Sequence, residues 1–474
     1  MKNNEIDTIA AISTPIGRGG IGIIRVSGKL VPEVAMKLFN KIPKPRTAEY
    51  LTCIDHNGSI MEKVITLFFP EPHSFTGENI LEIHGHGGQM ILDLLLDRIL
   101  NISSRIRLAN PGEFTERAFL NEKIDLIQAE SIADIINATS YQAAKSACNS
   151  LQGHFSNQIR IILNKITNFR TYIESTLDFS DQEISDISYQ HIYNTLQNII
   201  DNTNQICKLT HSGVLLRDGI KVVIAGKPNA GKSSLFNSLI NKDRAIISNI
   251  SGTTRDILHE YIQLNGIAFH IIDTAGFKKN STNEIELIGM QKSKYELSKA
   301  DHILWVIDST DYSHNNSYNN IINSLKKELS SNNIEAVFIT IIRNKSDLSF
   351  EHNGIDTTNK YACITLSALL NHGIDLLKKH LYDSAMLQIH KNSNFSSVEE
   401  NQGNFIARKR HLKILQKVFQ YLLSAKTQLQ YNMTVNDCFA EDLKKAHEEL
   451  AQIFGKLTPD DLLEEIFRAF CIGK

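Results

Sequence analysis

The fold is decided by the stretch GKPNAGKS, residues 226–233. It follows the apolar run VVIA (222–225) and leads into SLFNSLI (234–240), which predicts a helix start. Strand, glycine-rich turn and helix are the context that a G-x-x-x-x-G-K-[ST] phosphate-binding loop requires, because backbone N–H groups and the helix N-terminus then face the anion. We expect Lys232 to reach the phosphates and the hydroxyl of Ser233 to ligate Mg²⁺. The pattern therefore predicts a nucleotide-binding domain.

Later segments identify the base of the nucleotide and add candidate Mg²⁺ ligands. Asp273 ends an apolar run, where an acid beside the loop can hold the hydration shell of Mg²⁺. Asp347, in the segment NKSD, can accept two hydrogen bonds from guanine N1–H and N2–H₂, which adenine cannot donate. Ser367 and Ala368 would support the same base from the next strand end, and Thr254 is the candidate second Mg²⁺ ligand. Together these segments predict a GTPase domain.

The composition bounds the class of protein. With 474 residues the chain is long enough for about two to four domains. Its net charge of −2 argues against a broad basic surface for nucleic acid. No apolar run approaches the length of a membrane span, and the N-terminus has no apolar signal region, so we expect a cytoplasmic protein without a membrane segment. The six cysteines include no C-x-x-C pair and are expected to be reduced thiols.

Residues 1–121 predict a compact α/β domain. His84 and His86 have no third ligand at zinc spacing, so the glycines around them predict a tight strand-to-helix turn rather than a metal site. Arg25 and Glu82 stand among apolar strand residues, and an outward-facing charge on a half-buried strand is the structural alternative to a binding role. The expected strands cover residues 7–12, 21–26, 65–69 and 80–83, and the expected helices cover 90–100 and begin again at 111–117.

Residues 122–215 and 384–474 are predicted to be helical. Apolar residues recur at three- and four-residue steps from 132 to 177 in one long stripe, with one turn skipped after Ile136 and an interruption at Gly153. Neither half has a complete bundle of its own, so we expect one helical domain, split in sequence, with the GTPase domain (216–383) inserted into it. Further helices are expected at 189–209, 412–429 and 443–453, with a last helix start at 458–461.

The GTPase motifs lack one catalytic group. Small GTPases of the Ras type have a glutamine that orients the attacking water, whereas this chain has Phe277 after its D-T-A-G segment. Asn229 in the phosphate-binding loop can offer a carbonyl oxygen to a monovalent cation, and Glu286 can orient the water through a second water molecule. The structural alternatives are a turn residue at Asn229 and a surface charge at Glu286. The sequence does not decide between the functional and the structural role at either position.

Motifs spread along the whole chain point to one family. They are GRGGIG (17–22), FTGE (75–78), PGEF (111–114), FLNEKID (119–125), the phosphate-binding loop (226–234), GTTRD (252–256) and the terminal FCIGK (470–474). In this combination the chain resembles the tRNA modification GTPase family MnmE, also called TrmE, over essentially its full length. Other GTPases share only the central third.

The resemblance implies an N-terminal α/β domain that binds a formyltetrahydrofolate and forms a constitutive homodimer. It also implies a helical domain interrupted by a Ras-like P-loop GTPase domain. The ligands would be GTP, Mg²⁺, K⁺ and 5-formyltetrahydrofolate or another one-carbon tetrahydrofolate. The GTPase domains of two copies would meet when GTP and K⁺ bind, which activates hydrolysis. With an FAD-dependent partner, MnmG, in a heterotetramer, the family installs a carboxymethylaminomethyl (or aminomethyl) group at C5 of the wobble uridine of certain tRNAs.

By match of motif, the resemblance also implies the residues of the folate site. They are Arg25, Glu82, Lys123 and the terminal Lys474. An arginine or lysine suits the glutamate tail of a folate, and a glutamate can accept hydrogen bonds from the pterin edge. Cys471, in the same terminal segment, is the candidate catalytic thiol, with a core cysteine as the structural alternative.

The resemblance implies the residues of the GTPase site in the same way. Glu286 would orient the attacking water, and Ser233 and Thr254 would hold Mg²⁺. The K⁺ ligands would be Asn229, Ser248, Ile250 and Thr253, with Ile250 acting through its carbonyl. The GTP contacts would be Asn229, Ala230, Gly231, Lys232, Ser233, Ser234, Ser248, Asn249, Ile250, Ser251, Gly252, Thr253, Thr254, Asp273, Thr274, Ala275, Gly276, Asn344, Lys345, Asp347, Ser367 and Ala368.

Two other functions compete with this interpretation. A GTPase that assists ribosome assembly can share Asn229 and a residue of the Phe277 type, but it predicts an RNA-binding module with a basic face. This chain offers only the short cluster at 408–411. A non-catalytic GTP-dependent switch that dimerises through long helices predicts nucleotide binding with negligible turnover. Comparing GTP turnover in KCl and in NaCl separates these functions from a K⁺-dependent GTPase.

Overall fold

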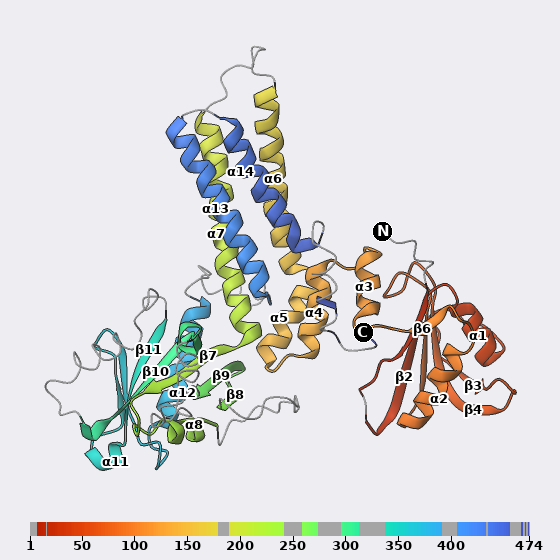
Figure 1. Ribbon diagram of the computed structural model, residues 1–474, viewed down its shortest axis with the longest axis horizontal. Helices are drawn as coiled ribbons and strands as arrows, with labels where there is room; N and C mark the ends of the chain where they lie inside the picture. Colours follow the sequence, from red (N-terminus) through yellow and green to blue (C-terminus); the bar gives the residue numbers. More distant parts are fainter. Residues whose placement is uncertain are drawn as a thin grey trace, which may run out of the picture. The chain divides into compact units, whose positions relative to one another are not determined.

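Figure 1 shows the helices and strands of the computed structural model. The structure describes residues 7–15, 17–178, 189–240, 258–273, 295–311, 337–390, 405–432, 435–455, 466–467, 470 and 473. The chain divides into two compact units. The first comprises Met1–Ala133, Leu151–Thr167 and Lys444–Lys474, and the second comprises Asp134–Ser150 and Asn168–Leu443.

The first unit is built on a mostly antiparallel sheet with the strand order β3-β4-β5-β2-β1-β6. Only the short pairing of β1 with β6 is parallel among the described strands of this sheet. The strands and helices predicted in this region are confirmed. The structure adds the strands Glu49–Ile54 and Ile106–Leu108 and the helix Val31–Phe39, which the sequence analysis did not predict. The strands are β1 (Thr8–Ile12), β2 (Gly19–Ser27), β3 (Glu49–Ile54), β4 (Ile60–Phe69), β5 (Ile80–Gly87) and β6 (Ile106–Leu108), and the helices are α1 (Val31–Phe39), α2 (Gln89–Leu100) and α3 (Glu113–Leu120).

The predicted turn after β5 is wrong for His84 to Gly87, because these residues continue the strand. Gly85 pairs with Gly22 and Gly87 pairs with Gly19 across the neighbouring strand β2. A Cβ atom at Gly87 would lie 2.5 Å from the carbonyl oxygen of Gly19. The glycines therefore permit a close approach of two strands, and the sequence signal for a turn and for such an approach is the same.

Alternation along the strands separates two faces of this sheet. Ala10 of β1 faces the core under α1 and α2, together with Ile24 of β2. Ile9 and Ala11 of β1 face the opposite way and pack with Phe114 of α3. Arg25, which is next to Ile24 on β2, therefore lies on the α3 face of the sheet.

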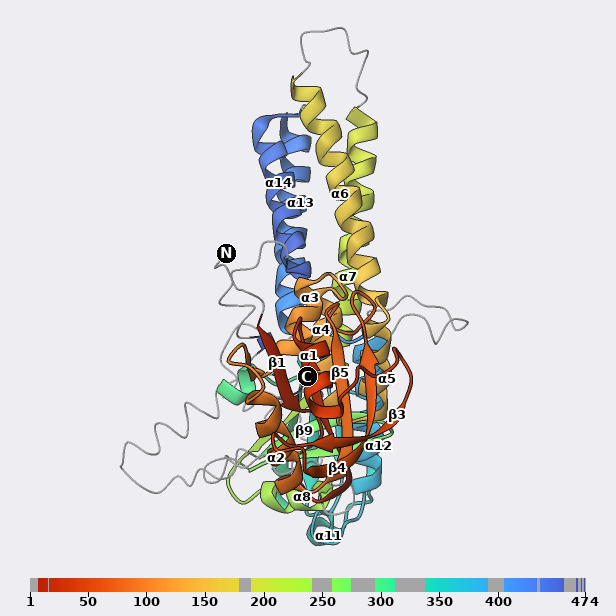
Figure 2. The same ribbon diagram turned by 90° about the vertical axis from the view of Figure 1, so that its right-hand side faces the viewer.

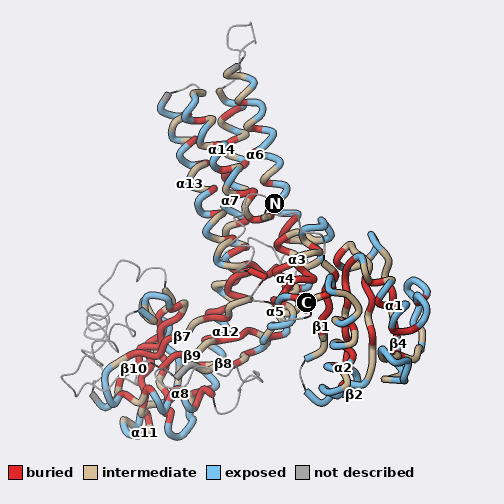
Figure 3. Tube along the Cα trace, turned by 45° about the vertical axis from the view of Figure 1, so that its right-hand side comes forward, coloured by how far each residue is buried: buried red, intermediate tan, exposed pale blue. Residues whose placement is uncertain are grey.

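The long apolar stripe forms α4 (Leu126–Ile136), α5 (Tyr141–Leu151) and α6 (His154–Asp178). The stripe is broken twice, between α4 and α5 and between α5 and α6. Gly153 lies in the second break, and its left-handed φ of +88° is typical of a helix C-terminus. Ile136 is 45% exposed, because α4 ends there. From α6 onward the stripe is confirmed, and Figure 3 shows buried residues recurring along the helix. They are Phe155, Ile159, Ile162, Ile166, Phe169 and Ile173.

Helices of the second unit pack lengthwise. In Figures 1 and 2 α7 (Tyr189–Asp218) and α13 (Lys409–Asn432) run side by side. Phe169 of α6 meets Phe439 of α14 (Asp437–Ala451) edge to face at 6.2 Å. The predicted stripes at 412–429 and 443–453 are thus confirmed as helices, whereas the predicted start at 458–461 lies outside the described residues. No helix in the described part of the chain is long and apolar enough to cross a membrane.

The second unit also holds a sheet with the strand order β12-β13-β11-β10-β7-β9-β8. Its central strands β13, β11, β10, β7 and β9 are parallel, and β12 and β8 are antiparallel edges. Helices α8 (Lys232–Ile240) and α12 (Ile374–His390) contribute to the core on one face. This confirms the predicted α/β class of the domain. The strands are β7 (Ile220–Gly226), β8 (Leu258–Leu264), β9 (Ile267–Asp273), β10 (His302–Asp308), β11 (Phe338–Asn344), β12 (Gly354–Asp356) and β13 (Ala362–Thr365).

A polar group is buried within this second sheet. His302 of β10 is 1% exposed, and its Nε2 hydrogen-bonds to the hydroxyl of Thr340 at 2.8 Å. The same hydroxyl lies 2.9 Å from Nε2 of His380 on α12. Burial, together with the neighbouring His380, lowers the pKa of His302 to about 3. The fold therefore keeps His302 neutral.

We predict that acid destabilises this sheet through His302. Its folded pKa lies below the ordinary 6.5, so the unfolded chain binds the proton first. Stability is therefore lost as the pH falls from about 6.5 towards about 3. The loss down to about pH 5 should be about 1–2 kcal/mol. Trp305, the single tryptophan of the chain, lies on β10 and reports urea unfolding by its fluorescence.

The matched variant is His302→Gln, which keeps a hydrogen-bonding side chain but does not titrate. Its unfolding midpoint should depend less on pH over the same range than that of the unaltered chain. Equal pH dependence in the two proteins would contradict the assignment to His302.

Candidate functional site

The phosphate-binding loop joins β7 to α8 as predicted, and its shape requires glycine at two positions. Gly226 has a φ of +143°, and a Cβ atom there would lie 2.1 Å from the carbonyl oxygen of Val306 on β10. Gly231 has a φ of +86°, and a Cβ atom there would lie 2.2 Å from Nδ2 of Asn344. Any other residue would push the loop away from the neighbouring strands. The glycines of the motif therefore hold the loop against the carboxyl edge of the sheet.

Charged and hydroxyl groups gather inside this loop. Lys232 is buried, and its ammonium donates to the carbonyl oxygens of Gly226 at 2.9 Å and Lys227 at 2.6 Å. The hydroxyl of Ser233 donates to Oδ2 of Asp273 at 2.9 Å, at the end of the neighbouring strand β9. Asp273 is 2% exposed. The hydroxyl and carboxylate oxygens are hard donors of the kind that Mg²⁺ prefers.

Asn344 connects this loop to the residues predicted to bind the base. Its Nδ2 donates to the carbonyl oxygen of Ala230 at 2.9 Å, and its Oδ1 accepts from the N–H of Ala368 at 3.0 Å. The hydroxyl of Ser367 donates to Oδ1 of Asp347 at 2.5 Å, which fixes the orientation of that carboxylate. The structure thus brings the predicted phosphate and base residues to one edge of the sheet.

One member of this site, Asp308, was missed by the sequence reasoning. Lys345 has a left-handed φ of +65°, and its ammonium pairs with Oδ2 of Asp308 at 2.6 Å. Burial alone would raise the pKa of Asp308, but hydrogen bonds from Lys345 and Thr310 outweigh it and hold the pKa below its ordinary value. Asp308 ends an apolar run on β10, which is the same signal that identified Asp273 on β9.

Asn229 occupies the exposed outer part of the phosphate-binding loop. Its φ of +64° is left-handed, a conformation that asparagine tolerates better than most residues. The structure therefore supports the turn role of Asn229, and a turn role leaves its side-chain oxygen available as a cation ligand. Ser234, another predicted contact, lies in the first turn of α8.

Several predicted site residues lie outside the described part of the chain. In the GTPase domain they are Ser248, Asn249, Ile250, Ser251, Gly252, Thr253, Thr254, Thr274, Ala275, Gly276 and Glu286, and in the terminal segment they are Cys471 and Lys474.

Two of the predicted folate residues form a pair on the N-terminal sheet. Arg25 on β2 lies directly opposite Glu82 on β5, and its Nη2 and Nε lie 2.7 Å and 3.0 Å from Oε1 of the glutamate. The rings of Phe75 and Phe114 lie 5.9 Å and 5.7 Å from the guanidinium carbon of Arg25. The side chains of the pair are 19% and 17% exposed, so neither is a solvent-facing charge. Lys123 is exposed.

The C-terminal segment returns to this domain. Phe470 is buried in a cluster with Phe467 and Ala129, and a Cβ atom at Gly112 would lie 2.4 Å from the carbonyl oxygen of Phe467. The carbonyl oxygen of Gly473 accepts from the hydroxyl of Ser13, just beyond β1, at 3.1 Å. Gly473 therefore lies against the end of β1, the strand next to the one that carries Arg25.

The sequence analysis expects reduced thiols, and five of the six cysteines lie in the described part of the chain. Cys53, Cys148, Cys207, Cys363 and Cys438 are free thiols. Burial raises the pKa of Cys53 and Cys207 to about 12 and of Cys363 to about 11, which keeps them protonated. Among the described residues no cluster of histidine, cysteine and carboxylate side chains could hold a metal ion.

Family models match most of the chain. A model described as the MnmE helical domain matches residues 126–471, and one described as the GTP-binding protein TrmE N-terminus matches residues 8–123. Two solved structures match part of the chain at low similarity. The G domain of the T. maritima FeoB iron transporter covers 37% of this chain and 99% of its own at 18% identity and a TM-score of 0.25. A GTP-binding protein from Sulfolobus solfataricus in complex with GDP covers 59% and 79% at 18% identity and a TM-score of 0.26.

Full-length relatives are more similar. A protein of Blochmanniella pennsylvanica named tRNA modification GTPase MnmE is 64% identical, and the match covers 100% of both chains. Proteins of the same name from Baumannia cicadellinicola and Pectobacterium carotovorum are 48% and 45% identical, with 100% and 99% of this chain and 100% of their own covered. The motifs, the family models and the end-to-end matches together show that the chain belongs to the MnmE family of tRNA modification GTPases.

Proposed function

We propose that the protein is a K⁺-dependent, dimerisation-activated GTPase that acts with an FAD-dependent partner on tRNA. The reaction would add a carboxymethylaminomethyl group at C5 of the wobble uridine. One observation carries the GTPase part. The side chain of Asn344 bonds to Ala230 of the phosphate-binding loop and to Ala368, and the neighbouring Ser367 donates to Asp347. Both ends of a guanine nucleotide can therefore be bound at one rigid edge.

The described residues suit the phosphates and the base of GTP. Lys232 supplies a positive charge inside the loop, and the N-terminus of α8 directs backbone N–H groups towards an anion. Asp347, oriented by Ser367, can accept the two hydrogen bonds that guanine donates. Ser233 and Asp273 have the oxygen donors for Mg²⁺, which would neutralise charge on the transferred phosphate. Thr254 is proposed as the other Mg²⁺ ligand.

Hydrolysis needs a water aligned with the γ-phosphorus and a means of stabilising the charge that forms as the bond to the β-phosphate breaks. We propose that Glu286 orients the attacking water. The negative charge that forms on the phosphates would be stabilised by K⁺, with Asn229, Ser248, Ile250 and Thr253 as its proposed ligands. The support from the described residues is the exposed position and left-handed conformation of Asn229.

The one-carbon site is proposed at Arg25, Glu82, Lys123 and Lys474, with a formyltetrahydrofolate as ligand. A guanidinium flanked by two phenylalanine rings and paired with a carboxylate is suited to a flat, hydrogen-bonding heterocycle with a carboxylate tail. Lys474 follows Gly473, whose carbonyl oxygen is bonded to Ser13 in the same unit. Cys471, in the same tail, is proposed as the thiol that acts on the substrate.

The proposed partners complete this picture. They are a second copy of the chain, which forms the dimer through the N-terminal domain, the FAD-dependent MnmG in a heterotetramer, and tRNA as substrate. The cytoplasm is the proposed compartment. Full-length similarity to proteins named tRNA modification GTPase favours this function over a ribosome-assembly GTPase or a non-catalytic switch.

The base assignment predicts a change of nucleotide preference. Asp347→Asn loses acceptor oxygens for guanine N1–H and N2–H₂, so GDP should bind at least about 100-fold more weakly. Xanthine has a carbonyl group in place of the 2-amino group, and the new amide can donate to it, so XDP should bind better than GDP. Titration with labelled GDP and XDP measures both. Asp356→Asn, an exposed change in the same domain, should leave both affinities unaltered.

The cation assignment predicts that GTP turnover is much faster in KCl than in NaCl. Asn229→Gly is the sharpest variant, because glycine accepts the same φ but has no side-chain oxygen. It should keep its affinity for GDP within about threefold and lose most of the K⁺ stimulation. Equal turnover of the unaltered chain in the two salts would count against the K⁺ mechanism, and full stimulation of the variant would remove Asn229 from it.

The folate assignment predicts that the terminal residue matters for binding. Deletion of Lys474 removes one positive charge, so 5-formyltetrahydrofolate should bind about 10–100-fold more weakly. Isothermal titration of the full chain measures the affinity. Lys63→Ala, which removes an exposed lysine from β4 of the same unit, should have no effect. Unchanged affinity after the deletion would exclude Lys474 from the site.

A further inference from the structure

One of the two rings beside Arg25 of the proposed folate site comes from a loop. Phe114 is fully buried in α3, but Phe75, the other ring beside Arg25, is 37% exposed. Phe75 belongs to the loop between β4 and β5, which contains Gly77 in a left-handed conformation. The position of the ring must therefore come from contacts made by its neighbours in the loop.

Both neighbours of Phe75 are held by hydrogen bonds, Thr76 to other elements and Ser74 within the loop. The hydroxyl of Thr76 lies 2.8 Å from that of Ser27 on β2, and its carbonyl oxygen accepts from Nδ2 of Asn121 at 2.7 Å. On the other side, the hydroxyl of Ser74 donates to the carbonyl oxygen of Glu78. The loop is thus anchored through Thr76 and Glu78.

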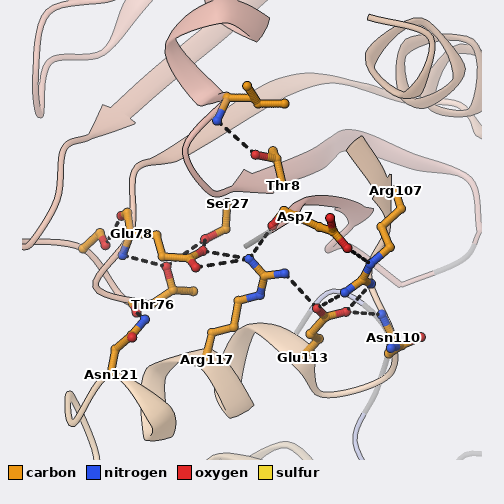
Figure 4. Close-up of polar contacts among 12 residues, drawn as sticks. Asp7, Thr8, Ser27, Thr76, Glu78, Arg107, Asn110, Glu113, Arg117 and Asn121 are labelled. Atoms are coloured by element: carbon orange, nitrogen blue, oxygen red, sulfur yellow. Dashed lines mark hydrogen bonds and ion pairs between the residues drawn. The ribbon is translucent and has the colours of Figure 1, made fainter. Parts of the chain in front are cut away.

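Arg117 of α3 lies at the centre of these contacts. Figure 4 shows its guanidinium between Glu78 and Glu113. Its Nη1 lies 3.1 Å from each carboxylate oxygen of Glu78 and 2.8 Å from the carbonyl oxygen of Asp7, and its Nη2 lies 2.9 Å from Oε1 of Glu113. Ser27 donates to the same carboxylate of Glu78 at 2.7 Å. One side chain therefore joins the loop, α3 and the start of β1.

Arg107 forms the outer end of the same network. Its Nη1 and Nη2 donate to the two oxygens of Glu113 at 2.8 Å and 2.7 Å. Burial alone would raise the pKa of Glu113, but hydrogen bonds from Arg107, from the N–H of Asn110 and from Arg117 hold it below its ordinary value. Arg107 is 42% exposed, whereas Arg117 is 11% exposed.

The placement of these charges favours a role beyond holding α3 in place. The side chains of Glu78 and Glu113 are only 14% and 7% exposed, and buried ion pairs give little net stability over apolar packing of the same volume. Without the guanidinium, the two buried carboxylates would lose their shared partner and Glu78 would turn towards water. The loop would move with it, and so would Phe75.

We propose that Arg117 is a positioning residue of the folate site, which keeps Phe75 against the guanidinium of Arg25 by anchoring Glu78. The inference rests on the proposed folate-binding role of Arg25 and Glu82. Arg117 is bonded to Glu78, Glu113 and the Asp7 carbonyl rather than to either member of this pair, so it acts through the loop. Its guanidinium is needed because a lysine cannot direct donors to Glu78, Glu113 and the Asp7 carbonyl together.

The test compares Arg117→Lys with Arg107→Lys in the full chain, titrated with 5-formyltetrahydrofolate. Both variants keep the charge and remove a guanidinium from Glu113, but only Arg117 reaches Glu78. Arg117→Lys should weaken folate binding about tenfold or more, whereas Arg107→Lys should change it less than about twofold. The difference absorption of the bound pterin should also change in Arg117→Lys alone, because the ring beside it has moved.

A double-mutant cycle separates positioning from a general loss of structure. If Arg117 acts by placing Phe75, the effects of Arg117→Lys and Phe75→Leu on folate affinity should be strongly non-additive. Unchanged GDP affinity in every variant provides the control for folding of the other unit. Equal losses in Arg117→Lys and Arg107→Lys, or additive effects in the cycle, would overturn the proposal.

Two further outcomes are distinguishable. If Arg117→Lys does not fold, Glu78→Gln is tested in its place. This variant keeps the volume of the side chain but weakens the ion pair with Arg117, so it should also lower the affinity for folate. Normal affinity in Glu78→Gln would overturn the proposal. If the unaltered chain does not bind the folate at all, the proposed folate function fails and the inference fails with it.

Discussion

The GTPase half of the structure depends on the side chain of one buried asparagine. Asn344 is 2% exposed, donates to the carbonyl oxygen of Ala230 in the phosphate-binding loop and accepts from the N–H of Ala368. A parallel sheet ends all its strands at one edge, but the loops that follow them are separate segments of chain. The amide of Asn344 joins two of these loops. It satisfies buried backbone groups that water cannot reach, so its loss would release both loops at once.

The N-terminal sheet carries paired charged residues on one of its faces. On one side, alternate strand residues build an ordinary apolar core under α1 and α2. On the other side, Arg25 and Glu82 pair across neighbouring strands, and Ser27 continues the polar row towards Glu78. Buried charges are tolerated only when each has a partner. A sheet face of this kind can accept a polar, flat ligand where an apolar face would exclude it.

Local sequence signals predicted local structure well. The phosphate-binding loop, β9 up to Asp273 and the helical stripe of α6 follow from residue spacing alone, because their determinants lie within a few residues of each other. The contacts that complete the sites depend on strand order and register instead. Nothing local relates Arg25 to Glu82, which are 57 residues apart. Likewise, the glycines of β5 could not be distinguished from a turn until their strand partners were known.

The junction between the helices and the GTPase sheet is held by a short covalent link and by buried ion pairs. Helix α7 runs to Asp218 and is separated from β7, the strand that precedes the phosphate-binding loop, by Gly219 alone. Asp134, whose side chain is 6% exposed, receives Arg217 from the last turn of α7 at 2.9 Å and Arg408 at 3.1 Å. A buried carboxylate shared by two arginines is costly to separate from either of them. The helix, the strand and the segment leading into α13 are therefore coupled by a covalent link and by ion pairs. Displacement of the phosphate-binding strand along its axis would have to displace α7 as well.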